Sequence, residues 1–286
     1  MPFVRECDEN ERVRLAALIR AGRNSSDPHG YHAMLFSYFD DSSDERRQKY
    51  FACGGLIGGE AQWLTFDALW ANATRDLIEP FRSTECECNQ KQFKEWPKSR
   101  CNALMDALVG LLQNYMLSAF ASIVPIADYK DVFPDCKKYD PYYLAVRHTI
   151  LNMAHIGWAG RHHVKLWFED NPATSPMTLK IYNEVKGVKN WDPATYLLGI
   201  TFGSKSLYPL QAADLVAREA FKHVDNLGTR STRIPMKRLG NRAAFALWRK
   251  EALVHLRDNG GPENIELLTS WEQTEPPPIP YFYKNF

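Results

Sequence analysis

The amino-acid sequence predicts an α/β fold whose first two strands form an antiparallel hairpin. Apolar runs of strand length alternate along the chain with apolar residues at helical spacing. The first two apolar runs, 33–40 and 50–57, are separated by a charged turn, as the strands of a hairpin are. The first run is continuously apolar and aromatic, which is typical of a strand covered on both faces.

The strand expected over residues 33–40 ends abruptly in acidic residues. Asp40 closes the apolar run and the polar sequence DSSD follows it. Ligands of open α/β sheets bind at strand ends, so this placement makes Asp40 a candidate site residue. The alternative interpretation is a simple polar turn, because Asp and Ser are common turn formers.

The second strand, over 50–57, contains the pair Gly54-Gly55 and is followed by the pair Gly58-Gly59. No Lys-Ser/Thr follows them, so the sequence does not predict a phosphate-binding loop. We interpret these residues as glycines of a twisted strand. The earlier residues 8–21 have the spacing of a short N-terminal helix, and a polar segment links it to the core.

The middle of the chain supplies more helices and strands. The pattern predicts helices over 60–81, 99–118 and 142–156, and strands over 121–127 and 163–168. Pro125 removes a ladder donor from its strand, which favours an edge position or a bulge. The strand over 163–168 again ends in carboxylates, Glu169 and Asp170.

A helix over 175–186 and a strand over 196–202 precede the loop and helix SKSLYPLQAADLVA. Asp214 interrupts the apolar part of that helix, three residues after Gln211 and on much the same face. A buried carboxylate without a partner is costly. We therefore expect Asp214 to be paired, hydrogen bonded or bound to a cation.

The chain after residue 225 is rich in cations, and a helix is expected over 243–256. Such clustering is typical of a nucleic-acid-binding patch, although an ordinary solvated helix face has the same appearance. The tail 275–283 is proline-rich and aromatic, and is expected to be extended, either docked through its aromatics or serving as a peptide ligand. The basic residues are Arg230, Arg233, Lys237, Arg238, Arg242, Arg249 and Lys250.

Composition bounds the remaining possibilities. The 286 residues carry a formal net charge of +1, so overall charge does not favour nucleic acid or a membrane. No apolar run reaches the roughly 18 residues of a spanning helix, and the N-terminus lacks the apolar segment of a signal peptide. We expect a cytoplasmic protein with no membrane partner and with reduced cysteines. The pair Cys86 and Cys88 lacks the companions that a zinc site needs.

Several motifs in order resemble one known family. These are YFDDSSD at a strand end, a CGGLIGG strand, a tryptophan-bearing helix and SKSLYPLQAADLVA late in the chain. Together they resemble the bacterial and archaeal domain-of-unknown-function family 3800, over roughly residues 34–223. The resemblance implies a ribonuclease H-like fold, that is, a mixed sheet opened by an antiparallel hairpin with helices on both faces. We expect this domain over 31–224, preceded by a helix and linker over 1–30 and followed by a basic helical extension with a Pro-rich tail over 225–286.

The sequence departs from the family pattern at three places. Asp41 stands where the family usually has Glu, and Ser43 stands where it has Gly. The family often carries a Glu-hydrophobic-His-Ala element before its central helix. The corresponding segment here is 85–88, which contains Glu85 and Glu87 but no histidine.

The resemblance and the recurring carboxylates together imply a metal-dependent nuclease. Such an enzyme hydrolyses phosphodiester bonds with two Mg²⁺ or Mn²⁺ ions, and these hard ions prefer oxygen ligands. Lys205 would contact the scissile phosphate as a point charge, or would be a solvated loop residue. The expected ligands are Asp40, Asp214, Glu169 or Asp170, and Glu85 or Glu87, with Asp41, Gln211 and Ser204 in support.

Two other classes of function are compatible with the same sequence features. A catalytically inactive module on the same fold would bind nucleic acid or protein through its basic segment and would tolerate loss of Asp40 or Asp214. A metal-independent hydrolase would use two carboxylates as acid and as base or nucleophile, as glycosidases do. Neither of these two classes requires a metal ion for its activity, whereas the nuclease does.

Overall fold

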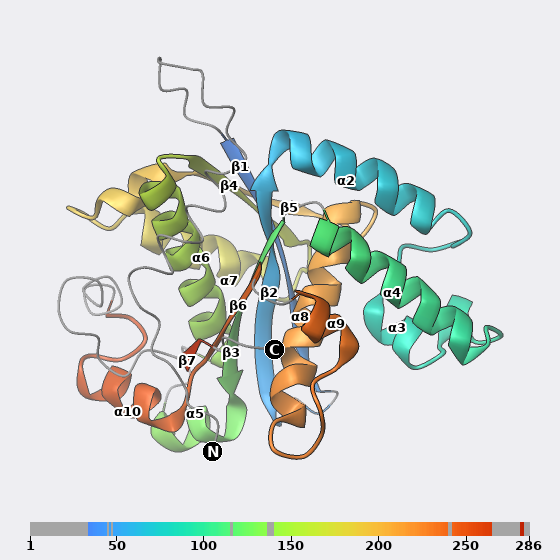
Figure 1. Cartoon of the computed structure of the whole chain (residues 1–286). Helices are drawn as coiled ribbons and strands as arrows, with labels where there is room; N and C mark the ends of the chain where they lie inside the picture. Colours follow the sequence, from blue (N-terminus) through green and yellow to red (C-terminus); the bar gives the residue numbers. More distant parts are fainter. Residues whose placement is uncertain are drawn as a thin grey trace.

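The computed structural model describes residues 34–44, 46, 48–114, 117–135, 140–239, 242–264 and 281–282. Within these ranges one seven-stranded sheet runs through the middle of the protein, and helices cover both of its faces (Figure 1). The α/β prediction is therefore confirmed. The helix expected over 8–21 and most of the Pro-rich tail lie outside the described residues.

The sheet is mixed, with strand order β5-β4-β1-β2-β3-β6-β7. β1, β2 and β3 pair antiparallel in succession, which confirms the predicted hairpin. β4 lies parallel to β1, β5 parallel to β4, and β6 parallel to β3. The strand bounds are β1 Met34–Ser43, β2 Tyr50–Gly59, β3 Ser118–Pro125, β4 His163–Glu169, β5 Leu197–Gly203, β6 Ala243–Leu247 and β7 Tyr281–Phe282.

Two apolar cores lie on the two faces of the sheet, because side chains on successive strand residues point to opposite faces. One face is covered by α2 (Glu60–Ala73), α3 (Ser83–Glu87), α4 (Lys98–Asn114), α8 (Tyr208–Asn226) and α9 (Ile234–Leu239). The other is covered by α5 (Ile126–Val132), α6 (Pro141–Gly160), α7 (Ser175–Lys186) and α10 (Lys250–Asp258).

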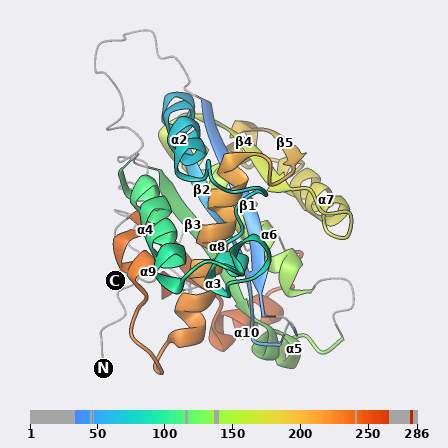
Figure 2. The same cartoon turned by 90° about the vertical axis from the view of Figure 1, so that its right-hand side faces the viewer.

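α8 is the central helix of its layer. Figure 2 looks onto this layer and shows α8 running across the sheet, with α2, α4 and α9 beside it. Pro209 lies in its first turn, where a fixed φ and a missing N–H suit the start of a helix. Most of its residues are buried, since it packs against β1 and β2 on one side and against helices on the other.

Helix α2 ends earlier than predicted, at Ala73 rather than near residue 81. The chain then runs through an irregular segment to α3, and the start of α3 reaches the candidate site.

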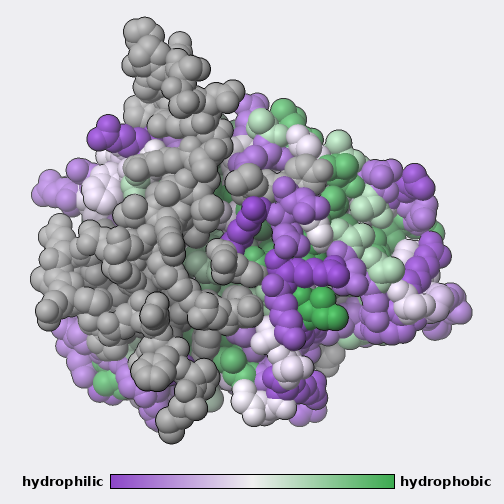
Figure 3. Space-filling view, viewed as in Figure 1, coloured by the Kyte–Doolittle hydropathy of each residue, from purple (hydrophilic) through white to green (hydrophobic). Residues whose placement is uncertain are grey.

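Figure 3 shows apolar side chains at the surface in the region of α2 and α4, among mostly hydrophilic ones. We find no helix, among the residues described, that has both the length and the apolar character needed to cross a membrane.

Pro125 occupies neither an edge strand nor a bulge. It is the last residue of β3, opposite Tyr50 of β2, and β3 is an inner strand paired also to β6. The proline then serves as the N-cap residue of α5, in an extended conformation with φ −67°. Because β3 ends at Pro125, the missing N–H of the proline does not interrupt the hydrogen bonds between strands.

The helix expected over 243–256 is wrong in its first half. Residues 243–247 form β6, which pairs with β3 from Ala119 opposite Ala243 to Ile123 opposite Leu247. The run AAFAL is apolar enough to lie in a covered sheet, and the amphipathic charge that suggested a helix begins only at α10. β7 adds antiparallel to β6, so the C-terminal region contributes strands to the main sheet.

Gly54 allows α8 to approach β2 closely. A Cβ atom at this position would lie 2.8 Å from the Ala217 Cα and 3.2 Å from the Ala121 Cβ. These contacts are shorter than van der Waals distances, and one of them is to backbone, which cannot turn aside. The glycine therefore sets the depth at which α8, and with it Asp214, lies against the sheet.

We expect Gly54→Ala to lower the free energy of unfolding by about 1–3 kcal/mol, because the added methyl overpacks the interface of α8 with the sheet. Gly110→Ala is the matched control, since Gly110 lies within α4 and a Cβ there meets no atom within 4 Å. That change should stabilise the protein by up to about 1 kcal/mol through helix propensity. Denaturant unfolding measures both, and a Gly54→Ala protein as stable as the parent would contradict the interpretation.

Candidate active site

Three carboxylates from separate elements meet around the ammonium group of one lysine. Lys205 lies in the loop between β5 and α8, and its Nζ atom donates a hydrogen bond to the carboxylate of Asp40. The same Nζ lies 3.7 Å from Glu169 Oε2 and 3.6 Å from Asp214 Oδ1. It also donates a hydrogen bond of 3.2 Å to the carbonyl of Leu210. Residues that are far apart in the sequence thus share one cation.

The pairing of β1 with β4 explains why two of these carboxylates are neighbours. The strands are parallel, and Phe39 lies opposite Phe168, so the next residues along, Asp40 and Glu169, come level with each other. Phe39 and Phe168 belong to the core beneath α6. Because successive side chains alternate, Asp40 and Glu169 point to the α8 face.

Asp214 comes from the second turn of α8 and is held by α3. The backbone N–H and the hydroxyl of Ser83 donate hydrogen bonds of 2.7 and 2.5 Å to its Oδ2 atom. The neighbouring residue, Arg82, places its guanidinium 3.4 Å from Glu169 Oε1. The segment that enters α3 therefore contacts two of the three carboxylates, at positions that the sequence did not single out.

Gln211 fixes the loop that carries the lysine. Its amide nitrogen donates a 2.8 Å hydrogen bond to the Lys205 carbonyl. Its amide oxygen accepts hydrogen bonds from Trp70 Nε1 at 2.9 Å and from the Phe81 N–H at 3.2 Å. The side chain is buried and joins α2, the segment before α3 and the loop before α8. Its contacts hold the Lys205 loop, Trp70 and the segment before α3 together.

Burial and the Asp40–Lys205 attraction shift the pKa values of these two residues in opposite directions. Asp40 and Lys205 are each 4% exposed. Burial raises the pKa of Asp40 well above its usual range; Lys205 works against this rise, and the Asp214 and Glu169 carboxylates add to it. Burial also works to lower the pKa of Lys205, but the three carboxylates outweigh it and the pKa is raised. The lysine is thus held in its charged form by its neighbours.

The pKa of Asp214 is shifted in the opposite direction from that of Asp40. Burial works to raise its pKa, but the Lys205 charge and the two hydrogen bonds from Ser83 outweigh burial and lower it. Asp214 is therefore an ionised carboxylate within a buried cluster. Three carboxyl groups face the Lys205 ammonium and the partly exposed Arg82 guanidinium, so acidic groups outnumber cationic ones by one in the cluster.

Glu85 lies on α3 two residues after Ser83, with 7% of its surface exposed. Its Oε1 atom pairs with Lys91 Nζ at 2.6 Å. Its Oε2 atom is buried and has no hydrogen-bond partner within the described residues. A buried oxygen of this kind is costly to leave unpaired, so Glu85 retains the capacity to bind another donor or a cation.

Three other candidate residues lie outside the contacts of Lys205. The Asp170 carboxylate accepts a 3.2 Å hydrogen bond from the Ser175 hydroxyl, so it is engaged at the start of α7. The Asp41 N–H donates to Asp40 Oδ1 at 2.8 Å and so helps to orient that carboxylate. The exposed Ser204 shares a 2.6 Å hydrogen bond with the Ser206 hydroxyl.

Glu87 belongs to a separate ion network along α8. It pairs with Arg218 at 3.0 Å and with Arg233 at 2.6 Å. Burial works to raise its pKa, but these two guanidiniums outweigh burial and lower it. Arg233 also lies 3.0 Å from the fully buried Glu219, whose pKa is raised to about 7, mainly by burial. The structure therefore places Glu87 with arginines and not with the lysine cluster.

Much of the expected basic patch is used within the protein. Arg233 pairs with acidic groups of the α8 network, and Arg238 lies 3.4 Å from Asp106. Lys250 pairs with Asp131, and Arg242 donates a hydrogen bond to the carbonyl of Gln113. Arg230 and Lys237 are exposed. These contacts fasten the C-terminal region to the rest of the fold and lower the charge that is free for a polyanion.

The donors of the cluster fit a hard divalent cation in their chemistry. All three are carboxylates, and the orphaned oxygen of Glu85 is of the same kind. Within the described ranges, however, no group of three or more His, Cys, Asp or Glu side chains is arranged to hold a metal ion. The Lys205 ammonium is the cation on which the carboxylates converge. Mg²⁺ or Mn²⁺ would bind here by taking over carboxylates that the lysine now holds.

Comparison with known protein families, with curated proteins and with solved structures gave no match to this chain. The geometry of the cluster is accordingly the basis for a functional assignment.

We expect Lys205→Met to lower the free energy of unfolding by about 3–5 kcal/mol at pH 7 in EDTA, because it leaves buried carboxylates without their cation. The exposed Lys189 offers a matched control, since Lys189→Met removes the same charge at the surface. Denaturant unfolding gives both values. Equal stability of the two variants would show that the carboxylates do not depend on the lysine.

Proposed function

We propose that the protein is a metal-dependent nuclease that hydrolyses phosphodiester bonds of nucleic acid at the Asp40, Glu169 and Asp214 cluster. The observation that carries the proposal is the convergence of three carboxylates from β1, β4 and α8 on one buried cationic point. A cluster of this composition is suited to cations and to phosphate chemistry, because oxygen ligands are those that Mg²⁺ and Mn²⁺ prefer.

The arrangement of the sheet is consistent with this proposal. An antiparallel β1-β2-β3 unit is extended by parallel β4 and β5, and helices cover both faces. These are the features that the ribonuclease H-like resemblance to family 3800 implies. The Gln211 and Asp214 motif that carries most of that resemblance lies directly at the cluster. We therefore keep the family as part of the proposal.

Asp40 and Asp214 would hold the catalytic ions, with Glu169 beside them and Glu85 as the fourth candidate. Bound ions would activate the attacking water and stabilise the leaving oxygen. Ser83 keeps Asp214 ionised and oriented through two hydrogen bonds. Lys205 contacts all three carboxylates, and its ammonium would pair with a phosphate oxygen of a bound substrate.

A binding module without catalysis is the second candidate. It is favoured by one observation, that Lys205 already neutralises part of the cluster and so gives the carboxylates a structural role. A metal-independent hydrolase that uses two of the carboxylates is the third. Chelation separates it from the nuclease, because such an enzyme keeps its activity in EDTA.

The proposal is tested by titrating Mn²⁺ into the parent protein, Asp40→Asn and Asp214→Asn in a calorimeter, and by following cleavage of single- and double-stranded DNA and RNA. Each substitution removes one ligand charge and keeps the shape of the side chain. We expect weaker Mn²⁺ binding and at least about a hundredfold slower cleavage in both variants, because catalysis depends on charge held at this point.

Asp192→Asn is the matched control. Asp192 is an exposed aspartate that precedes β5, at the end of that strand opposite to the cluster. Cleavage that persists in Asp214→Asn would contradict the proposal, and cleavage that persists in EDTA would favour the metal-independent enzyme. A parent protein that does not bind Mn²⁺ and does not cleave any of the substrates would favour the binding module.

A further inference from the structure

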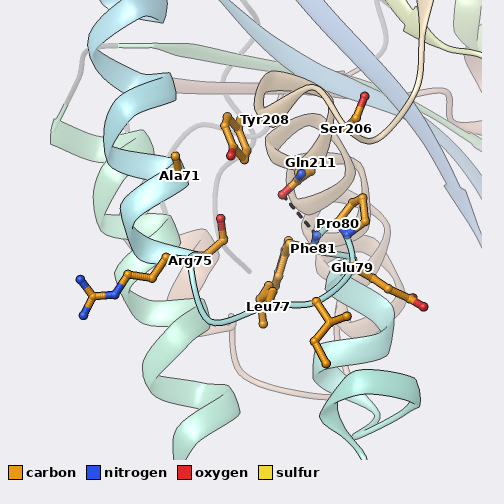
Figure 4. Close-up of a pocket in the computed structure, with 11 residues that line it drawn as sticks. Ala71, Arg75, Leu77, Glu79, Pro80, Phe81, Ser206, Tyr208 and Gln211 are labelled. Atoms are coloured by element: carbon orange, nitrogen blue, oxygen red, sulfur yellow. Dashed lines mark hydrogen bonds between the residues drawn. The ribbon is translucent and has the colours of Figure 1, made fainter.

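A pocket of about 260 Å³ opens beside the carboxylate cluster. It lies between the end of α2, the segment 77–81 and the start of α8 (Figure 4). In the figure, Tyr208 lies between α2 and α8, above Leu77 and Phe81, while Arg75 reaches away from the other labelled residues. The pocket is small compared with the several hundred Å³ of a typical drug-sized site. It suits one ring system of a larger molecule.

The pocket and the cluster share their framework. Ser206 and Phe81 line the pocket, and their chain neighbours Lys205 and Arg82 contact the carboxylates. Gln211 lies in the pocket wall and also binds the Lys205 carbonyl and the Phe81 N–H. A chain molecule with one unit at the carboxylates would therefore place an adjacent unit at the pocket.

The walls combine an aromatic ring with a charged group at the rim. Tyr208 is half-buried and lines the pocket. Glu79 lies at the edge of the pocket, whereas the Arg75 guanidinium points away from it, toward Asn72 and Asp76. Ile78 is 94% exposed, yet its N–H and that of Glu79 are held by Gln92 Oε1 at 3.1 and 3.2 Å. The segment that forms this wall is thus fixed in place and presents an apolar side chain to solvent.

We propose that this pocket receives one unstacked base of a single-stranded nucleic acid, next to the phosphate that lies at the carboxylates. The inference rests on the proposed function and specifies its substrate class. Aromatic side chains bind bases of single strands by stacking, and every base offers a face for this. A base within a duplex reaches such a pocket only after it leaves the stack, which costs a few kcal/mol. The pocket therefore selects single strands over duplexes.

The charge distribution supports the same choice. Duplex binding without base contacts depends on many Lys and Arg contacts to phosphates. The net charge is only +1, and Arg233, Arg238 and Lys250 are paired within the protein. Local recognition of one nucleotide needs fewer free cations than a long duplex track does.

The test is equilibrium binding of a single-stranded DNA 12-mer that carries one 2-aminopurine, with Ca²⁺ in place of Mg²⁺. The full chain is compared with Tyr208→Ala, with Tyr208→Phe, which keeps the ring, and with Tyr196→Ala, a half-buried tyrosine before β5. We expect the parent to prefer the single strand to its duplex and to quench 2-aminopurine at one position. Tyr208→Ala should weaken binding by about 5- to 100-fold and abolish the quenching, while the other two variants should not.

A second measurement uses only the parent protein, so it does not depend on the folding of a variant. Single abasic sites are placed at each position of the same 12-mer in turn. An abasic site at one position should weaken binding by about tenfold, and equal affinities at all positions would overturn the inference. Equal affinity for single strand and duplex would also overturn it, as would binding by Tyr208→Ala as tight as that of the parent. Cleavage by Asp214→Asn reports on the proposed function separately. Binding through Tyr208 without any cleavage would overturn that function alone, and cleavage without dependence on Tyr208 would overturn the pocket alone.

Discussion

Three carboxylates that lie close together, one of them buried and two partly buried, are stabilised by a cation among them. Lys205 supplies this cation, and the elements around it are arranged so that its ammonium reaches Asp40, Glu169 and Asp214 together. Removal of one partner from a buried ion cluster leaves the others uncompensated, so the cluster constrains the register of β1 with β4 and the position of α8. Gly54 meets this constraint, since it lets α8 pack close enough to the sheet.

The carboxylate cluster is held in place by residues that surround it. Ser83 and Arg82 bring α3 to the carboxylates, and Gln211 ties the lysine loop to α2 and to the segment before α3. That segment also forms one wall of the pocket. The carboxylate cluster and the pocket beside Tyr208 are therefore connected by one shared set of buried polar contacts. Under the proposed function, Lys205 would hold the carboxylates in place for divalent ions, and the pocket would select single strands.

The sequence predicted the parts of this arrangement that leave a local signal. Asp40 follows the apolar run of β1 and Asp214 interrupts an apolar helix, and both lie in the cluster. The strand does not end at Asp40 as expected, because pairing with β2 continues to Ser43. The choice between Glu169 and Asp170 needed the strand register, which puts Glu169 on the α8 face. Ser83 left no signal, because its contact with Asp214 joins residues 131 positions apart. The helix expected over 243–256 was wrong because pairing with β3 overrides the local helical preference of its first half.

Anomalous diffraction from crystals of the protein soaked in Mn²⁺ tests the central claim most directly. We expect a peak within reach of the Asp40 and Asp214 carboxylates, with the Lys205 ammonium moved away from the position between them. Such a peak would establish the cluster as a metal centre that the lysine holds ready. A Lys205 ammonium that still contacts all three carboxylates, with no anomalous peak beside them at saturating Mn²⁺, would contradict the account and identify the cluster as a structural ion network.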